Sequence, residues 1–165
     1  MHHRRLLAVL ACVFVLAVEL PAADGQRRPA TRTPTAVDLF DVFEASILDL
    51  QEAQTAGRVT SRGLVDAYLA RIGAYDQAGP RLNALVLINP RAREEADALD
   101  RERAARGPRG PLHGIPVVIK DNYDTADMPT SGGTLGLATL QPAADAFQVT
   151  RLREAGAVIL GKTTM

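Results

Sequence analysis

The strongest indication of fold in this chain is an apolar run with no polar residue in it, Ile115–Ile119, which ends at Lys120. A strand with one face in solvent alternates apolar and polar side chains, whereas a strand inside a parallel sheet is covered on both faces and stays apolar throughout. The run therefore predicts a buried strand, and Val158–Leu160 is a second segment of the same kind. Strands of this type need helices on both sides of their sheet.

Helical patterns alternate with these apolar segments along residues 38–165. We expect helices over 38–54, from a cap at Thr60 or Ser61 onward, over 91–106 and over 145–154, with a further strand over 82–88. This alternation predicts an α/β fold with a parallel or mixed sheet. So few strands do not close a layered core, so we expect an incomplete domain, one part of a larger fold.

The first 25 residues predict an export signal. Arg4 and Arg5 form a short positive region, Leu6–Val18 is apolar without a charge, and small residues precede a cut after Gly25. Two alternatives stay open, a transmembrane anchor and a lipoprotein box that ends at Cys12. The signal interpretation predicts an exported protein, periplasmic or extracellular, with no stable membrane insertion once the signal is removed.

Residues 26–37 predict a disordered linker, rich in proline, arginine and threonine, and residues 38–165 form the predicted folded portion. Removal of the signal takes away Cys12 and leaves His113 as the only histidine, which excludes a zinc site of cysteine and histidine in this chain. We expect no cofactor and no metal. The 19 basic and 19 acidic residues balance, which argues against nucleic acid as a partner.

Lysine is rare in this chain: Lys120 and Lys162 are the only two lysines among 19 basic residues. An arginine stays charged at any relevant pH, whereas a buried lysine can lose its proton and act as a base or nucleophile. Lys120 ends the apolar run, a setting that disfavours a charged amine, so we interpret it as a candidate catalytic residue. The alternative is a strand-end lysine whose stem packs while its ammonium reaches solvent.

Residues 156–163 match the phosphate-loop pattern G-x-x-x-x-G-K-[ST] letter for letter. In a nucleotide site the first glycine follows a strand, and the residues between the two glycines form a loop whose amides wrap a phosphate. Here the residues between them, 157–160, are apolar and themselves predict a strand, and Gly156 ends the preceding helix. We therefore interpret the match as structural, with Lys162 at a strand end where it holds a loop, and keep nucleotide binding as the weaker alternative.

Few side chains could serve as a nucleophile. Of the serines, Ser46 falls in a predicted helix, Ser61 is a possible cap, and Ser131 precedes two glycines in the turn region 128–136. These glycines could offer backbone amides to an oxyanion, or they could serve a turn that needs positive φ. His113 lies in a loop of glycine and proline, where it is either a catalytic base or a local structural residue.

The segment Gly110–Asn122 resembles the lysine strand of the amidase signature family. The following Asp124–Leu137 is similar to that family's turn of proline, threonine and glycine, and Ala155–Thr163 is similar to its next helix-to-strand segment. Upstream, Val59–Ile72 and Leu82–Leu85 resemble the family's N-terminal helix and first strand. The lysine strand is the most specific of these segments. The other segments support the resemblance by their order and spacing along the chain.

The resemblance covers residues 43–165 and departs from the family at Thr164, where an asparagine is usual. It implies a mixed sheet layered between helices, and hydrolysis of a carboxamide C–N bond through an acyl-enzyme. In that family a lysine, a serine on a cis peptide and a nucleophilic serine form a proton-relay triad. Only the lysine has a counterpart here, Lys120. Both serines belong to a downstream segment that this chain does not contain, so we expect the chain alone to be inactive.

The resemblance further implies a small-molecule amide as the substrate of the full-length protein. We expect Val117–Ile119 to form a dry wall beside Lys120, and Asp121 and Asn122 to brace backbone turns, with the Asp121 carboxylate directed away from the amine. An alternative from another class is a non-catalytic binding module, or a degenerate relative, that uses this part of the fold. The sequence predicts no oligomeric state.

Overall fold

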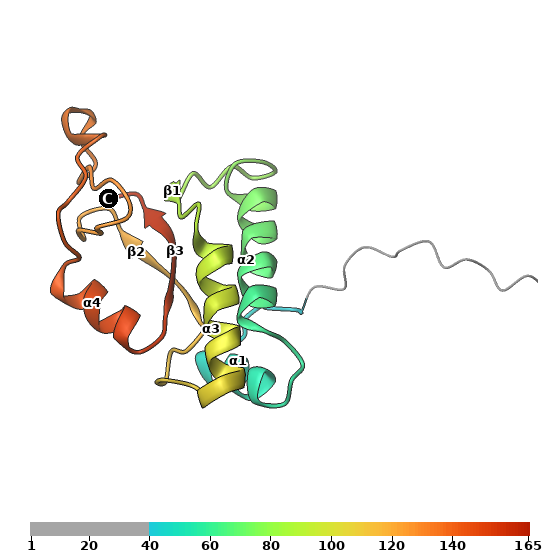
Figure 1. The fold of residues 1–165 in the computed structure, drawn as a ribbon. Coiled ribbons are helices and arrows are strands. Elements are labelled where there is room, and N and C mark those ends of the chain that lie inside the picture. The colour runs from blue at the N-terminus through green and yellow to red at the C-terminus, as the bar shows by residue number, and fades with distance from the viewer. Residues whose placement is uncertain (1–39) are drawn as a thin grey trace, which may run out of the picture. The chain divides into compact units, whose positions relative to one another are not determined.

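The structure, a computed structural model, describes residues 40–165 (Figure 1). The predicted export signal, residues 1–25, and the predicted linker, residues 26–37, lie outside the described residues. The elements of the described part are, in order, α1 (Ile47–Thr55), α2 (Ser61–Tyr75), β1 (Leu85–Ile88), α3 (Ala92–Arg106), β2 (Pro116–Lys120), a short 3-10 helix η1 (Leu135–Leu137), α4 (Phe147–Glu154) and β3 (Val158–Thr163). None of the helices over residues 40–165 combines the length and the hydrophobicity that a membrane span requires.

The strands form one mixed sheet in the order β1–β3–β2. β2 runs parallel to β3, with Val117 beside Ile159 and Lys120 beside Thr163, and β1 runs antiparallel to β3 on its other side. Helices α2 and α3 lie on one face of the sheet and α4 on the other (Figure 1). The predicted α/β class is therefore confirmed, with a mixed sheet between helices.

Strand β3 supplies side chains to the packed layers on both faces of the sheet. The layer under α2 and α3 contains Val65, Ala92, Ala96, Leu99, Val158 and Leu160. The layer under α4 contains Ile119, Met128, Val149 and Ile159. Because successive residues of a strand point to opposite faces, the alternate residues of β3 enter alternate layers. This explains why the sequence of β3 is apolar without alternation.

Helix α1 begins later than the pattern predicts. Ser46, expected inside a helix over 38–54, is the N-cap: its hydroxyl accepts the Asp49 N–H at 3.2 Å, and the Asp49 carboxylate accepts the Ser46 N–H at 2.8 Å. Phe43, which falls inside the expected helix over 38–54, lies before α1 and is 62% exposed. A serine side chain competes for backbone donors and favours the end of a helix over its interior, which is why the predicted start is wrong.

Helix α2 begins as predicted, with Thr60 as its N-cap. The Thr60 hydroxyl accepts the N–H of Gly63 at 3.0 Å. Asp100 of α3 adds a second cap from outside the helix, accepting the N–H of Ser61 at 2.7 Å and that of Arg62 at 3.0 Å. The first N–H groups of a helix lack partners within it and carry a partial positive charge, so this carboxylate stabilises α2 and binds it to α3.

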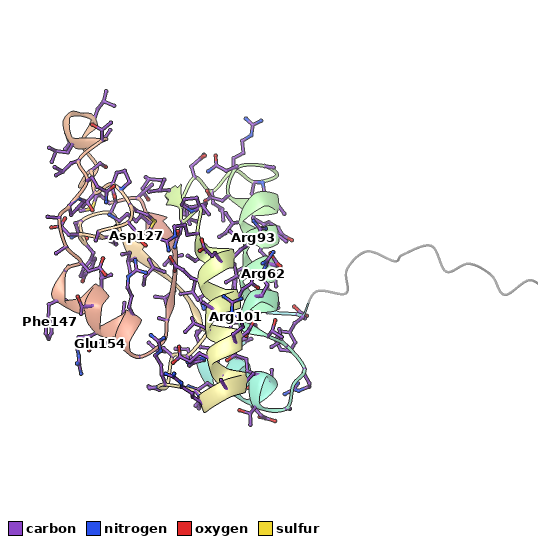
Figure 2. All side chains as sticks on the ribbon, in the orientation of Figure 1. Arg62, Arg93, Arg101, Asp127, Phe147 and Glu154 are labelled. Carbon is purple, nitrogen blue, oxygen red and sulfur yellow. The ribbon has the colours of Figure 1, made fainter. Side chains whose placement is uncertain are left out.

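A row of ion pairs runs along the solvent side of α2 and α3, where Figure 2 labels Arg62 and Arg93. Arg62 pairs with Asp66 at 2.9 Å and with Asp97 at 2.7 Å, and Arg93 pairs with Asp66 at 2.7 Å. Exposed pairs of this kind contribute at most about 1 kcal/mol each. They set the register of the two helices more than they stabilise the fold, and the buried apolar layer beneath them contributes more to stability.

Strand β2 departs from the prediction that its apolar run is buried on both faces. Ile119 is buried, but Val118 is 45% exposed and Lys120 is exposed as well. β2 lies at the edge of the sheet, and only the face that carries Val117 and Ile119 packs against α4 within the described residues. The other side of the run is covered only near its start, where Ile115 is buried in a cluster with Leu50 of α1 and Leu64 of α2.

Candidate active site

Lys120 lies at the carboxyl end of β2, beside Thr163 of β3. Its Nζ donates a hydrogen bond to the carbonyl oxygen of Thr164 at 3.2 Å, and the side chain is exposed. The expectation that Val117–Ile119 forms a dry wall beside this amine is wrong for the described residues. Residues 117 and 119 point to the face opposite Lys120, and Val118, which shares its face, lies in solvent.

Lys162 is the buried lysine of the described chain, with a side chain that is 0% exposed. Its Nζ donates to the carbonyl oxygen of Pro129 at 2.7 Å and to the hydroxyl oxygen of Thr130, and it lies 3.6 Å from Oδ1 of Asp121. Burial lowers the pKa of Lys162, and the nearby Asp121 carboxylate opposes that shift. The expectation that Lys162 lies at a strand end and holds a loop is confirmed, since it is the last residue but one of β3.

The two lysines point to opposite faces of the sheet. Ile119 of β2 pairs with Lys162 of β3, so these two side chains share the face that packs against α4. Lys120 follows Ile119 and points to the other face. The ammonium that is exposed and the ammonium that is buried therefore lie back to back at the ends of two neighbouring parallel strands.

Asp121 connects the end of β2 to the glycine-containing turn that follows Pro129. Its backbone N–H donates to the carbonyl oxygen of Thr163 at 3.0 Å. Asp121 is 3% exposed. Its carboxylate accepts hydrogen bonds from the backbone N–H and the hydroxyl of Ser131 and faces Lys162. Asp121 thus braces a turn, as expected, and its carboxylate is engaged away from the Lys120 amine.

Ser131 serves this turn. Its hydroxyl donates to Asp121 and accepts the N–H of Gly133 at 3.2 Å. Gly132 and Gly133 have φ of 58° and 76°, the left-handed region that favours glycine. The turn interpretation is confirmed, and the Gly133 amide, bonded to the serine beside it, is not free to bind an oxyanion.

His113 is a structural residue. It is 2% exposed, its Nδ1 accepts the backbone N–H of Arg109 at 3.0 Å, and its Nε2 lies 2.9 Å from the carbonyl oxygen of Leu99. A carbonyl accepts only, so Nε2 carries the proton and the ring is held as one neutral tautomer. Both ring nitrogens are occupied by backbone, and the interpretation of His113 as a catalytic base is wrong.

The phosphate-loop match is structural, as the sequence indicates. Residues 157–160 are buried, residues 158–160 of them within β3, and Gly156, with φ of 91°, forms the turn between α4 and this strand. A Cβ atom added at Gly156 would lie 2.6 Å from the Cα of His113, so the backbone of residue 113 packs directly against this glycine. Over residues 40–165 no cluster of three or more histidine, cysteine, aspartate and glutamate side chains has the arrangement of a metal site.

Comparison with known proteins identifies the same family that the sequence of the lysine strand resembles. The family model described as Amidase matches residues 63–165, which is most of the chain. The chain belongs to the amidase family. Among solved structures, the peptide amidase of Stenotrophomonas maltophilia is 52% identical with a TM-score of 0.71, and the match covers 73% of this chain and 24% of that one. An amidase family protein from Bacillus anthracis is 45% identical with a TM-score of 0.72, covering 75% of this chain and 25% of that one.

Curated relatives match over a similar stretch. A glutamyl-tRNA(Gln) amidotransferase subunit from Halorhodospira halophila is 41% identical over 125 residues, covering 75% of this chain and 25% of its own length. The chloroplastic/mitochondrial counterpart from Oryza sativa subsp. japonica is 36% identical over 166 residues, covering 99% of this chain and 28% of its own length. The chain therefore spans about a quarter of the length of the amidase relatives that it matches.

The residues that organise this end of the sheet include several that the sequence does not reveal. Thr130 and Pro129 bind Lys162 from 32 and 33 residues away along the chain, and no local pattern points to that contact. A signal was available for Asp121 because it follows the conspicuous lysine directly. The burial of Lys162 could have been suspected from its place close behind the apolar stretch Val158–Leu160 of the same strand.

Proposed function

We propose that this chain is the N-terminal part of an exported amidase that hydrolyses carboxamide C–N bonds, with Lys120 as the general base. The observation that carries the proposal is the position of Lys120 at the carboxyl end of a parallel strand, where its side chain is exposed on the face of the sheet opposite α4. The carboxyl ends of parallel strands are where α/β proteins bind ligands. The match to amidases over residues 63–165, which includes this strand, supports the assignment.

The serines that the described residues offer are occupied by structural contacts. Ser46 caps α1, Ser61 accepts a hydrogen bond from Gln54 at 3.2 Å, and Ser131 binds Asp121. We therefore place the nucleophilic serine and the relay serine in the part of the amidase length that this chain does not span. Those segments would also cover Val118 and Lys120 and remove water from the amine.

In the proposed reaction, the uncharged Lys120 amine accepts a proton through the relay serine as the second serine attacks the carbonyl carbon of the amide. The C–N bond breaks, the leaving amine receives the proton, and an ester joins the acyl group to the serine. Water then attacks this ester by the same route and releases the carboxylic acid. An ordinary lysine is protonated at neutral pH, so the amine becomes a base only when its surroundings exclude water.

The test is the hydrolysis of small carboxamides by the full-length protein and by two variants. Lys120→Met and Lys120→Arg should both abolish turnover while leaving the protein folded, because neither side chain accepts a proton at neutral pH. The described chain alone should release no ammonia from the same amides. Robust turnover by the arginine variant would contradict the assignment of the base.

Export is proposed from the signal-like residues 1–25 and has its own test. Mass spectrometry of protein collected outside the cytoplasm should find Gln26 as the first residue. Cytoplasmic protein that retains Met1 would contradict export without affecting the assignment of Lys120.

The second candidate is a non-catalytic binding module, and the structural use of the described serines favours it. It predicts that the isolated chain unfolds in one cooperative thermal transition, as a self-sufficient domain does. An amidase portion that exposes Val118 at 45% should instead aggregate or melt without a sharp transition.

A further inference from the structure

The Lys162 ammonium is held by three groups from one short stretch of chain on the far side of the sheet from Lys120. They are the carbonyl oxygen of Pro129, the hydroxyl oxygen of Thr130 and the carboxylate of Asp121. Thr130 in turn donates to the carbonyl oxygen of Tyr123 at 3.3 Å, and its N–H donates to Leu140 at 2.9 Å. The buried Lys162 ammonium therefore contacts both the start and the end of the segment 121–130, which follows β2.

A buried ammonium paired with a carboxylate, as Lys162 is with Asp121, contributes little to the stability of a fold. A buried ion pair loses its hydration, and an apolar side chain of similar volume often replaces it without loss. Its directed donors do fix geometry, because Pro129, Thr130 and Asp121 must all stay in place to satisfy one ammonium that is 0% exposed. The contact therefore defines where the backbone around residue 121 can lie.

That backbone is the part of the chain that sets the position of Lys120. The Asp121 N–H is bonded to Thr163, and the Asp121 carbonyl oxygen accepts the N–H of Gly132 at 3.0 Å. The Lys120 amine itself reaches the carbonyl oxygen of Thr164 at 3.2 Å. The backbone next to Lys120 and the Lys120 amine are thus both hydrogen-bonded to the carboxyl end of β3. Lys162 lies in the same strand, one residue before Thr163.

We propose that Lys162 is a positioning residue for the amidase reaction. From the opposite face of the sheet, its ammonium locks Asp121 and the Pro129–Ser131 segment and so fixes the strand end from which the Lys120 amine acts. The proposal rests on the proposed function, in which Lys120 is the base. Lys162 does not touch the substrate.

The test compares Lys162→Met with Leu64→Ala in the full-length amidase. Methionine keeps the length of the side chain and removes the donors. Leu64 is 0% exposed in a separate apolar cluster with Leu50 and Ile115, so its truncation lowers stability without changing the contacts of the Lys162 ammonium. We expect Lys162→Met to lower kcat about 10- to 100-fold with KM nearly unchanged, since a reacting group displaced by about 1 Å costs about 100-fold. Leu64→Ala should retain kcat at temperatures where both variants are folded.

A second variant keeps the test decisive if Lys162→Met folds poorly. Asp121→Asn with Lys162→Met removes both buried charges, so it should regain stability while kcat stays low. In the full-length protein, hydrogen exchange of the Asp121 and Gly132 amides should quicken in this double variant relative to amides of α2. Equal exchange, or a kcat restored together with stability, would overturn the positioning role.

Failure of the proposed function gives a different result. Full turnover by Lys120→Met would remove the base assignment whatever Lys162 does. Inactive Lys120→Met together with a fully active Lys162→Met would leave Lys120 as the base and overturn only the role of Lys162.

Discussion

Replacement of Gly156 by alanine tests whether residues 156–163 form a packed turn and strand. Gly156 has φ of 91°, and an added Cβ would lie 2.6 Å from the Cα of His113. The left-handed backbone costs an alanine about 1–2 kcal/mol. The clash adds about 1–3 kcal/mol, as overpacking of a filled site does. His113 cannot move aside without cost, because both of its ring nitrogens are hydrogen-bonded to backbone.

Gly57 provides the matched control. Its φ is 68°, and nothing lies within 4 Å of the position that a Cβ would take. Gly57→Ala therefore carries the backbone penalty without the clash, and the change in unfolded-chain entropy is the same for both variants. The difference between the two losses isolates the contact with His113, about 1–3 kcal/mol.

The assay is urea unfolding of the full-length protein followed by circular dichroism, with the free energy of unfolding extrapolated to water. We expect Gly156→Ala to lower it by clearly more than Gly57→Ala does. Equal losses would refute the packing argument, because an open loop with its amides turned toward a ligand would leave room for the added methyl group at residue 156.

Other expected outcomes concern the caps and the buried charge. Asp100→Ala should lower the free energy of unfolding by about 2 kcal/mol, because two N–H groups at the start of α2 lose a charged acceptor; a loss near zero in urea unfolding would contradict this. Burial lowers the pKa of Lys162, so the unfolded chain binds more protons as pH approaches the ordinary lysine value of about 10.4. The free energy of unfolding should therefore rise with pH in that range relative to Lys162→Met, and a parallel pH dependence in the two proteins would argue against it.

Local and periodic features of the fold could be predicted from the sequence. The alternation of helices and apolar strands gave the class, and Thr60 marked the start of α2 because its hydroxyl acts on the next turn of the same helix. The start of α1 was missed because Ser46, which falls inside the expected helix over 38–54, acts as the cap of α1. Capping is a competition between side chain and backbone, and periodicity does not report it.

The surroundings of the candidate site could not be predicted from the sequence. The lysine strand pointed to Lys120, whose side chain is exposed, and Val118 beside it is 45% exposed. The burial of Lys162 depends on Pro129, which is 33 residues away. Contacts across such distances arise from the register of β2 and β3, and no local pattern encodes them.

The most direct test of the central claim is the charge of the Lys120 amine in the full-length amidase. Lysine labelled with carbon-13 at Cε reports protonation by its chemical shift, and the signals of residues 120 and 162 can be assigned with Lys120→Arg and Lys162→Arg. The full-length protein should show the uncharged amine at neutral pH. A Lys120 signal that stays fully charged there would contradict its role as the base.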